Sequence, residues 1–334
     1  MTTDVADPVE AVAIAPAADP GFLQRHGATI EYILIPGAAL AGALVVFGIF
    51  VALFGKNPLD LYFYMYYGAF GTWFSWQNTL TRAAPLILTA LCTALPAQLG
   101  MVIIGGEGAL HAGICSLPRV NDIAVGIALM LFGTGLAFYL GKPLIEPTAP
   151  RLPAIDFGWW SDIPQLRAAL RVNVLFLIGV ALAPVLYWAF RTTRWGLLIR
   201  TAGESADAAR AMGHSVLLIR LRATMVGGFL AGIGGSFLSL FYPGSWNEGL
   251  SSGQGITAVA LVIFARWDPM LCLWASLAFG GAAALGPALQ SVGVTSGYHL
   301  FNAAPYILTL LIMIITCSPK RTLTGAPAEL SITR

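Results

Sequence analysis

Charged side chains are scarce in this sequence of 334 residues, where Asp, Glu, Lys and Arg together make up only 10%. Globular domains are about a quarter charged, so a soluble fold would have too few charges to cover its surface. Hydrophobic residues make up 57% of the chain and gather in long runs. A bilayer needs about 20 predominantly apolar residues per crossing helix. These features predict an all-α, polytopic transmembrane helix bundle.

Motifs for several kinds of chemistry are also missing. There is no G-x-x-x-x-G-K-[ST] phosphate loop, so the chain does not itself harness ATP, and no G-x-S-x-G elbow of a membrane hydrolase. The four cysteines form no CxxC pair, and no His or Cys residues stand at metal spacing. We therefore expect no enzyme activity and no bound metal or cofactor. The net charge of +2 is too small to indicate a nucleic-acid partner.

Apolar runs predict about eight membrane segments. The aromatic-rich stretch 60–76 is expected to form an interfacial helix, because Tyr and Trp favour the membrane–water boundary. The run 255–265 is long enough for only half a crossing. The remaining spans are expected at 33–54, 83–104, 122–140, 173–190, 223–242, 269–289 and 304–317.

The Lys and Arg residues predict the orientation of these spans. If the N-terminus lies inside, most of the basic residues, including those of the loop 191–222, fall on the inner side. Residues 1–28 include no basic n-region and apolar core of a signal peptide, so we expect a disordered cytoplasmic tail. The transmembrane domain is then 29–318, and 319–334 form a second cytoplasmic tail.

The basic loop 191–222 contains the pattern of a short helix. Ser205–Met212 is a stretch of high helix propensity. Glu204 and Ser205 form an N-terminal signal, and Gly213 stands where a glycine ends a helix. Before this helix, Trp195–Arg200 is expected to continue a helix out of the membrane.

Two further features of this loop bear on its role. Gly203 permits a break before the short helix. The alanine face of that helix is expected to seat in a groove on a partner protein, fixed by Asp207 and Arg210 at i and i+3. An ordinary polar connector is the alternative that the residues leave open.

Residues in and beyond this loop resemble a known family. The loop is similar to the coupling-helix region of permease subunits from bacterial ATP-binding-cassette (ABC) importers. Downstream, GLSSGQGITAVAL over 249–261 matches a second family pattern, and 105–108 looks like its intramembrane G-x-E-G turn. From about residue 30 to 317, the order of these motifs resembles the inner-membrane translocators for simple sugars, nucleosides and branched-chain amino acids. The nucleoside group is the most similar.

The resemblance implies a permease subunit in the bacterial inner membrane that forms the path for a small polar solute, a nucleoside or a simple sugar. It also implies cytoplasmic ABC ATPase subunits, a second permease and an extracytoplasmic solute-binding protein as partners, besides the lipid bilayer. Coupling to the ATPase would be carried by the loop residues Gly203, Glu204, Asp207, Ala208, Ala209, Arg210 and Gly213.

Polar residues in the apolar runs suggest where the translocation path lies. Glu107 stands between glycines, and ionisable groups at such depth are functional candidates, although a structural role with backbone amides stays open for it. Gln98 is most simply explained by a hydrogen bond between helices. The expected path residues are Gly106, Glu107, Gly253, Gln254 and Gly255.

The sequence departs from the family in one region. Between the G-x-E-G turn and the segment matching 120–123, members carry a much longer stretch than 111–119, and we infer that a membrane hairpin is missing. A truncated, non-transporting paralogue is therefore one alternative. A secondary transporter or channel is another, although such proteins usually show two similar halves and no repeat is visible. A lipid-modifying membrane enzyme would need a polar cluster that is not found.

Overall fold

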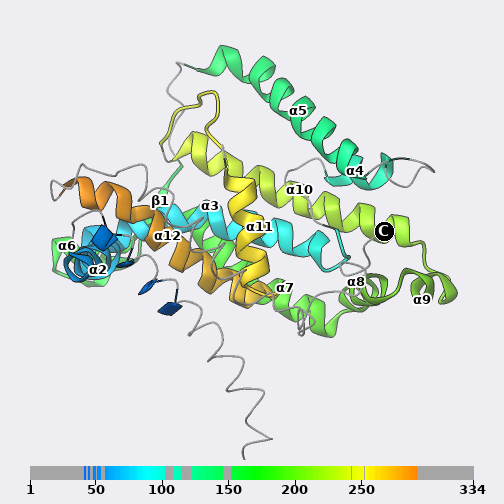
Figure 1. Ribbon diagram of the computed structural model, residues 1–334, viewed down its shortest axis with the longest axis horizontal. Coiled ribbons are helices and arrows are strands. Elements are labelled where there is room, and N and C mark those ends of the chain that lie inside the picture. The colour runs from blue at the N-terminus through cyan, green and yellow to red at the C-terminus, as the bar shows by residue number, and fades with distance from the viewer. Residues whose placement is uncertain are drawn as a thin grey trace, which may run out of the picture.

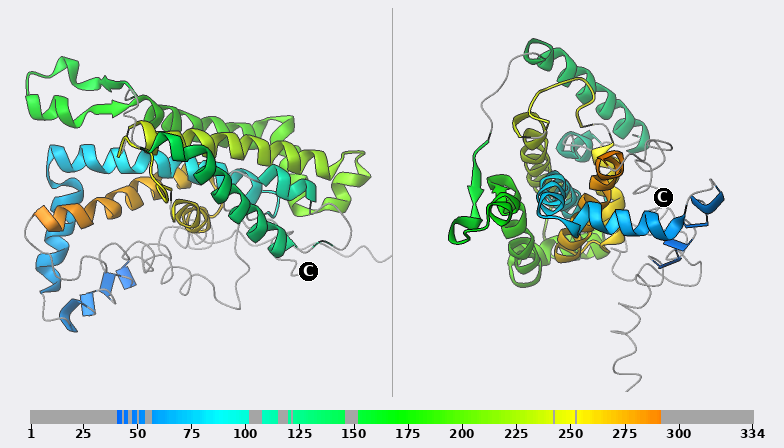
Figure 2. Two further views of the ribbon diagram at one scale, coloured as in Figure 1. Left: turned by 90° about the horizontal axis from the view of Figure 1, so that it is seen from above. Right: turned by 90° about the vertical axis from the view of Figure 1, so that its left-hand side faces the viewer.

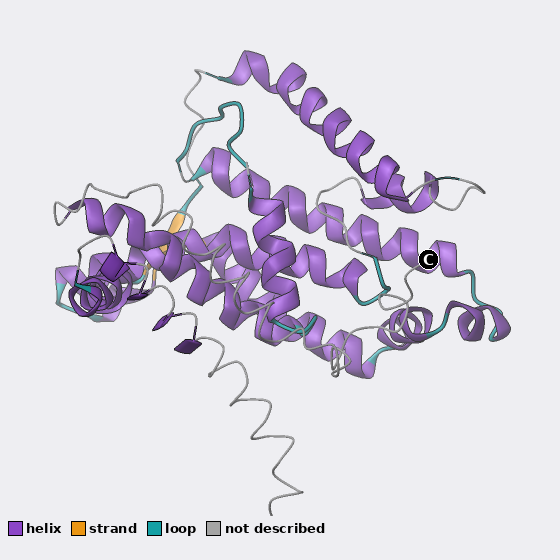
Figure 3. Cartoon of the chain, viewed as in Figure 1, coloured by secondary structure: helices purple, strands orange, loops and turns teal. Residues whose placement is uncertain are grey.

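The described part of the chain is almost entirely helical, with one pair of short strands (Figure 3). The computed structural model describes residues 41–42, 44–45, 48–49, 51–53, 57–101, 108–114, 120, 122–145, 152–241, 243–251 and 253–291. In chain order the elements are α2 (Pro58–Tyr66), η1 (Tyr67–Gly71), α3 (Trp73–Ala97), α4 (Gly108–Ile114), α5 (Asp122–Gly141), η2 (Lys142–Leu144), β1 (Ala154–Asp156), η3 (Phe157–Trp160), α6 (Pro164–Ala169), β2 (Arg171–Asn173), α7 (Val174–Thr192), α8 (Arg194–Glu204), α9 (Ala206–Ala211), α10 (Val216–Leu240), α11 (Gln254–Phe264) and α12 (Pro269–Ser291).

In the described part of the chain, four helices are long and apolar enough to cross a bilayer, namely α3, α5, α7 and α10. The helix α11 and the first part of α12 are shorter apolar helices. At about 1.5 Å per residue, α11 covers about half of a hydrocarbon core that is about 30 Å thick. The predicted all-α, polytopic membrane bundle is thus confirmed, and its half-length segment has the predicted position.

The centre of the bundle is α3, which lies between α10 on one side and α7 and α12 on the other (Figure 1). Small residues bring these helices close to α3. A Cβ atom on Gly280 of α12 would lie 2.7 Å from the Cβ of Ala83, and one on Gly227 of α10 would lie 2.7 Å from the carbonyl oxygen of Cys92. Close approach through small residues is typical of membrane helix pairs.

The boundaries of α3 differ from the predicted span 83–104. The helix begins ten residues earlier, where the Thr72 hydroxyl accepts a hydrogen bond from the backbone N–H of Ser75. It ends at Ala97 because Gly100 adopts a left-handed conformation and the N–H of Met101 bonds the carbonyl of Pro96. The stretch 60–76, predicted as one interfacial helix, is therefore divided among α2, η1 and the start of α3.

Other boundaries follow the sequence more closely. The helices α5, α7 and α12 lie within a few residues of the predicted spans. The span predicted at 223–242 instead begins at Val216, because Ser215 caps α10 and the basic residues of its first turns are helical. The predicted span 304–317, most of 33–54, and both predicted tails lie outside the described residues.

The two ends of the bundle carry different structures (Figures 1 and 2). At one end, β1 pairs antiparallel with β2, and an ion pair joins Asp156 to Arg171 at 3.3 Å. The N–H of Leu152 bonds the carbonyl of Leu240 at 3.1 Å, which ties this hairpin to the end of α10. The helices α8 and α9 lie at the opposite end, which we call the α9 end.

Candidate functional site

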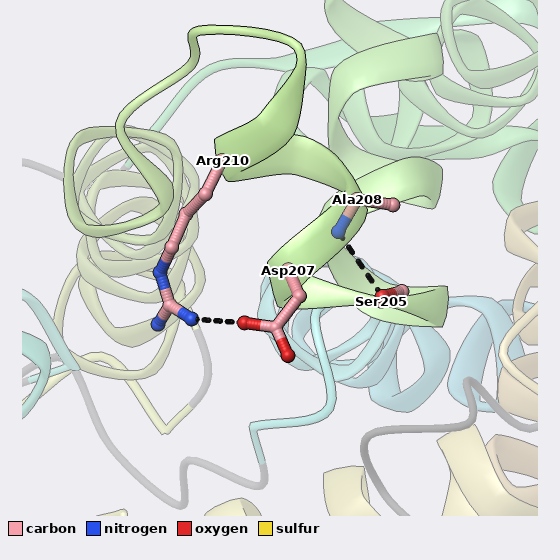
Figure 4. A network of polar contacts seen from close by, with 4 residues as sticks. All are labelled: Ser205, Asp207, Ala208 and Arg210. Carbon is pink, nitrogen blue, oxygen red and sulfur yellow. Dashed lines mark hydrogen bonds and ion pairs between the residues drawn. The ribbon is translucent and has the colours of Figure 1, made fainter.

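The helix α9 is short and has a defined start and end. The Ser205 hydroxyl accepts a hydrogen bond from the N–H of Ala208 at 3.2 Å and so caps the helix (Figure 4). At the other end, Gly213 has a φ of +82°, and the N–H of His214 bonds the carbonyl of Ala209 at 3.1 Å. This hydrogen bond is typical of a glycine-terminated helix. The short helix predicted from the sequence is confirmed, together with its glycine end at Gly213, whereas its start is set by Ser205.

The charged pair on α9 is solvent-exposed. Arg210 Nη1 donates to Asp207 Oδ1 at 2.6 Å (Figure 4), and the two side chains are 59% and 92% exposed. Exposed pairs of this kind add little stability, typically about 0.3–0.5 kcal/mol at helical spacing. The predicted i, i+3 pairing is confirmed, and both groups are open to a partner.

The alanine face of α9 differs from the prediction. Ala206 and Ala209 are buried against the rest of the chain, so these two residues hold α9 in place and do not seat in a partner. Ala208 lies on the exposed side. Large apolar side chains are also exposed at the α9 end. They are Leu197 on α8, Met212 directly after α9, and Leu217 and Leu218 on α10.

The helix α8 is a separate element and does not continue α7 as predicted. Thr193 adopts an extended conformation between the two helices, and its hydroxyl accepts a hydrogen bond from the N–H of Gly196 at 3.1 Å. A Cβ atom on Gly196 would lie 2.3 Å from the carbonyl oxygen of Ala189. The rings of Phe190 and Trp195 stack with centroids 6.0 Å apart. The elbow between α7 and α8 is therefore tightly packed.

Gly203 was predicted to break the chain before α9, but it lies inside α8, and the break comes at Ser205. Its role is instead to let the backbone of α8 approach the end of α3. A Cβ atom on Gly203 would lie 2.0 Å from the carbonyl oxygen of Gln98, which follows the last residue of α3. Ile199 and Ala202 on α8 are fully buried. The helix α8 thus packs its backbone directly on the end of the central helix.

The side chain of Gln98 makes a long-range contact at the same place. Its Nε2 donates to the carbonyl oxygen of Trp267 at 2.8 Å, in the turn between α11 and α12. The sequence predicted a hydrogen bond between helices for Gln98; the side chain does bond a distant segment, but Gln98 follows the end of α3 and its partner lies in a turn, so neither group is within a helix. The partner was not predictable, since a backbone carbonyl in a turn 169 residues away leaves no signal in the sequence.

The predicted path residues are only partly described. Gly253 has a φ of +79° and precedes the first turn of α11, where its carbonyl accepts from the N–H of Thr257 at 2.9 Å. The Oε1 atom of Gln254 is buried and has no hydrogen-bond partner among the described residues. Gly106 and Glu107 lie outside those residues, so their predicted place on the translocation path stays a prediction.

No group of three or more His, Cys, Asp or Glu residues within the described ranges is arranged to hold a metal ion. The features that stand out in the described residues are structural ones. They are an exposed helix, a tightly packed elbow, a backbone contact onto the central helix and a half-length helix that starts at a left-handed glycine.

Comparison with known proteins adds a family. Residues 37–317 match the model of the family described as the branched-chain amino acid transport system permease component. The chain is 31% identical over 191 residues to the putative glucose ABC transporter permease protein TsgC13 of Haloferax volcanii, a match that covers 56% of this chain and 58% of the relative.

Two further relatives come from bacteria. Identity is 27% to the guanosine ABC transporter permease protein NupQ of Bacillus subtilis, covering 70% of this chain and 88% of the relative. Identity is 24% to the nucleoside ABC transporter permease protein NupC of Lactococcus lactis, and the match covers 62% of this chain and 68% of the relative. No solved structure matches.

Proposed function

Since this chain belongs to the permease-component family of branched-chain amino acid transport systems, we propose that it is the membrane subunit of an ABC importer. Its helix bundle forms the path for a small polar solute. The solute is a nucleoside or a simple sugar, because relatives named for guanosine, nucleoside and glucose transport are 24–31% identical to it over the matched regions.

The observation that carries the proposal is the α8–α9 segment. Transport driven by a separate ATPase needs a rigid element that the ATPase can grip. The helix α9 has a capped start, a glycine end and a buried alanine face, so a force applied to its exposed side moves the helix as a unit. Its exposed side presents Asp207 and Arg210 beside apolar Met212, a mixture of charge and apolar surface that suits a protein partner.

Partners and orientation follow from this assignment. Cytoplasmic ATPase subunits contact the α9 end through Glu204, Asp207, Ala208 and Arg210. Both termini lie on the cytoplasmic side, since most Lys and Arg residues fall there when the chain is threaded in this way. A second permease completes the path, and a solute-binding protein docks at the opposite end, where the β1–β2 hairpin lies.

The path itself is proposed to pass the start of α11. A half-length helix leaves its first turn within the bilayer, where unwound backbone is tolerated only if it lines a cavity or is buried in protein. Gly253, Gln254 and Gly255 occupy this position, and the unpartnered Oε1 of Gln254 offers an acceptor to a solute hydroxyl or amine. Gly106 and Glu107 are proposed to complete the path.

The proposal is tested with Ala208→Arg, which adds bulk and charge to the exposed side of α9. A substitution at Ala209 would not serve, because that residue is buried and its replacement would also disturb folding. We expect Ala208→Arg to insert normally into the membrane, to lose retention of the ABC ATPase that the proposal requires, and to lose solute uptake. The measurement is co-purification of the ATPase, together with uptake of labelled nucleosides and sugars.

The matched control is Asp162→Arg, an exposed charge change at the hairpin end. It should leave ATPase retention unchanged. If Ala208→Arg retained the ATPase and transported at the wild-type rate, the α9 assignment would be wrong. If the wild-type chain neither retained an ATPase nor transported, the importer assignment itself would fail.

A further inference from the structure

Three segments that are far apart in the sequence meet at the α9 end of α3. They are the residues that follow α3, the last turn of α8, and the turn that joins α11 to α12. Gln98 touches both of the others. Its carbonyl oxygen lies against Gly203, and its side-chain Nε2 donates to the carbonyl of Trp267 at 2.8 Å.

The contact between Gln98 and Gly203 involves backbone only. Because a Cβ atom at Gly203 would lie 2.0 Å from the Gln98 oxygen, no side chain stands between α8 and the end of α3. Such a contact cannot be absorbed by a change of rotamer. A displacement of α8 must either move the end of α3 or open a gap in a junction where Ile199, Ala202 and Leu99 are fully buried.

The turn between α11 and α12 is strained. Arg266 and Trp267 have φ angles of 49° and 60°, in the left-handed region that residues with a Cβ rarely adopt. Trp267 is only 2% exposed, and the Asp268 carboxylate caps α12 by accepting from the N–H of Met270 at 2.8 Å. Strained backbone of this kind persists only where the surroundings hold it, and the Gln98 amide is one of the groups that hold it.

We propose that Gln98 is a positioning residue that transmits movement of α8 and α9 to α11. It does so through the contact of its backbone carbonyl with Gly203 and through the hydrogen bond from its side-chain amide to the carbonyl of Trp267. The inference rests on the proposed importer function and adds the route by which movement of α9 reaches the solute path. Force on α9 reaches α8, then the end of α3, then the turn after α11. The helix α11 begins directly after Gly253, on the proposed solute path, so the route ends where access to solute is controlled.

The test is Gln98→Met in the full importer, assembled with its ATPase, second permease and binding protein. Methionine keeps the length and flexibility of the side chain but removes the N–H donor. The Trp267 carbonyl then loses its partner, and the turn after α11 loses its hydrogen bond to the end of α3, while the packing of α11 on α3 remains. We expect ATP hydrolysis to remain near the wild-type rate while solute uptake falls about tenfold, the scale of one lost hydrogen bond. The number of ATP molecules spent per solute then rises by the same factor.

The matched control is Thr93→Val, a buried polar-to-apolar change on α3. The Thr93 hydroxyl donates to the carbonyl of Thr89 on its own helix at 2.9 Å, and among the described residues it has no hydrogen bond to another segment. It should leave the ratio of ATP hydrolysed to solute transported unchanged. Gln98→Lys returns an N–H donor at this position, so the number of ATP molecules hydrolysed per solute should fall part of the way back to the wild-type value.

Each outcome of this experiment has one meaning. If Gln98→Met lowered uptake and ATP hydrolysis in proportion, the residue would be merely structural; if it changed neither, the side chain would be dispensable. Either result would overturn the inference. If the wild-type assembly showed no uptake coupled to ATP, the proposed function would fail instead, which is a separate result.

Discussion

The helices α3 and α5 are both long and apolar enough to cross a bilayer, yet their surroundings are opposite. In the apolar stretch of α3, 78% of the residues are buried in the protein, against 6% in α5, although α5 is the more apolar of the two. Figure 1 shows α3 enclosed by α7, α10 and α12, whereas α5 stands apart above α10. Hydropathy therefore identifies helices that enter the membrane but does not show which one forms the centre.

Small residues on the neighbouring helices account for the difference. Gly280, Gly227 and Gly179 each bring a helix backbone against α3. On α5, a Cβ atom at Gly135 would meet nothing within 4 Å. Because lipid tails are as apolar as leucine, an uncovered apolar helix costs little in a bilayer, so α5 needs no such partners.

The position of α5 also bears on the shortened region before it. The sequence predicts that a membrane hairpin is missing next to 109–119, and α5 is the first helix after that gap. A helix that loses its packing neighbours is expected to have uncovered sides, and this is what α5 has. Lipid or the proposed second permease would cover them, and α3 would keep its core unchanged.

The largest expected effect comes from adding bulk at the centre of the bundle. Gly280→Val places side-chain atoms where even a Cβ lies 2.7 Å from Ala83, so α12 must move away from α3. Overpacking of this kind costs about 1–3 kcal/mol or more. The matched change Gly135→Val on α5 has open space and should be nearly neutral. Thermal unfolding of the purified full chain in detergent measures both, and equal losses would show that α5 is packed as tightly as α3.

A second effect is expected where α8 contacts the end of α3. Gly203→Ala places a Cβ 2.0 Å from the Gln98 carbonyl oxygen, so α8 must shift away from it. We expect uptake of solute to be lost, with a drop in stability of about 1–3 kcal/mol. Gly232→Ala on α10, where a Cβ meets nothing within 4 Å, is the control and should transport normally. Normal uptake by Gly203→Ala would mean that the contact is loose enough to adapt.

Much of the fold could be predicted because membrane spans are long apolar runs. The helices α5, α7 and α12 lie close to their predicted ranges for this reason. The start of α3 was missed because the hydroxyl of Thr72 begins the helix inside an aromatic stretch that suggested the interface. Its end was missed because apolar residues continue past Gly100, and only the left-handed glycine shows where the helix stops.

The candidate site could be predicted to a similar extent. Ser205 and Gly213 bound α9 by local rules, which operate over a few residues and can be recognised in a sequence. Which alanines are buried depends on the rest of the bundle, and so Ala209 was expected to face a partner although it is buried. The contact of Gly203 with Gln98 brings together residues that only the fold makes neighbours.

The smallest expected effect tests single hydrogen bonds on the two compared helices. On α3, the hydroxyl of Thr79 is buried and donates to the carbonyl of Ala69 at 2.8 Å, outside its own helix. On α5, the hydroxyl of Thr134 donates to the carbonyl of Met130 at 2.7 Å, one turn back. Thr79→Val should cost about 0.5–1.5 kcal/mol, because the Ala69 carbonyl is left without that donor. Thr134→Val should cost close to nothing, since the helical N–H bond to Met130 remains. Thermal unfolding of the two variants side by side measures the difference, and a larger loss for Thr134→Val would place α5, not α3, in the better-packed environment.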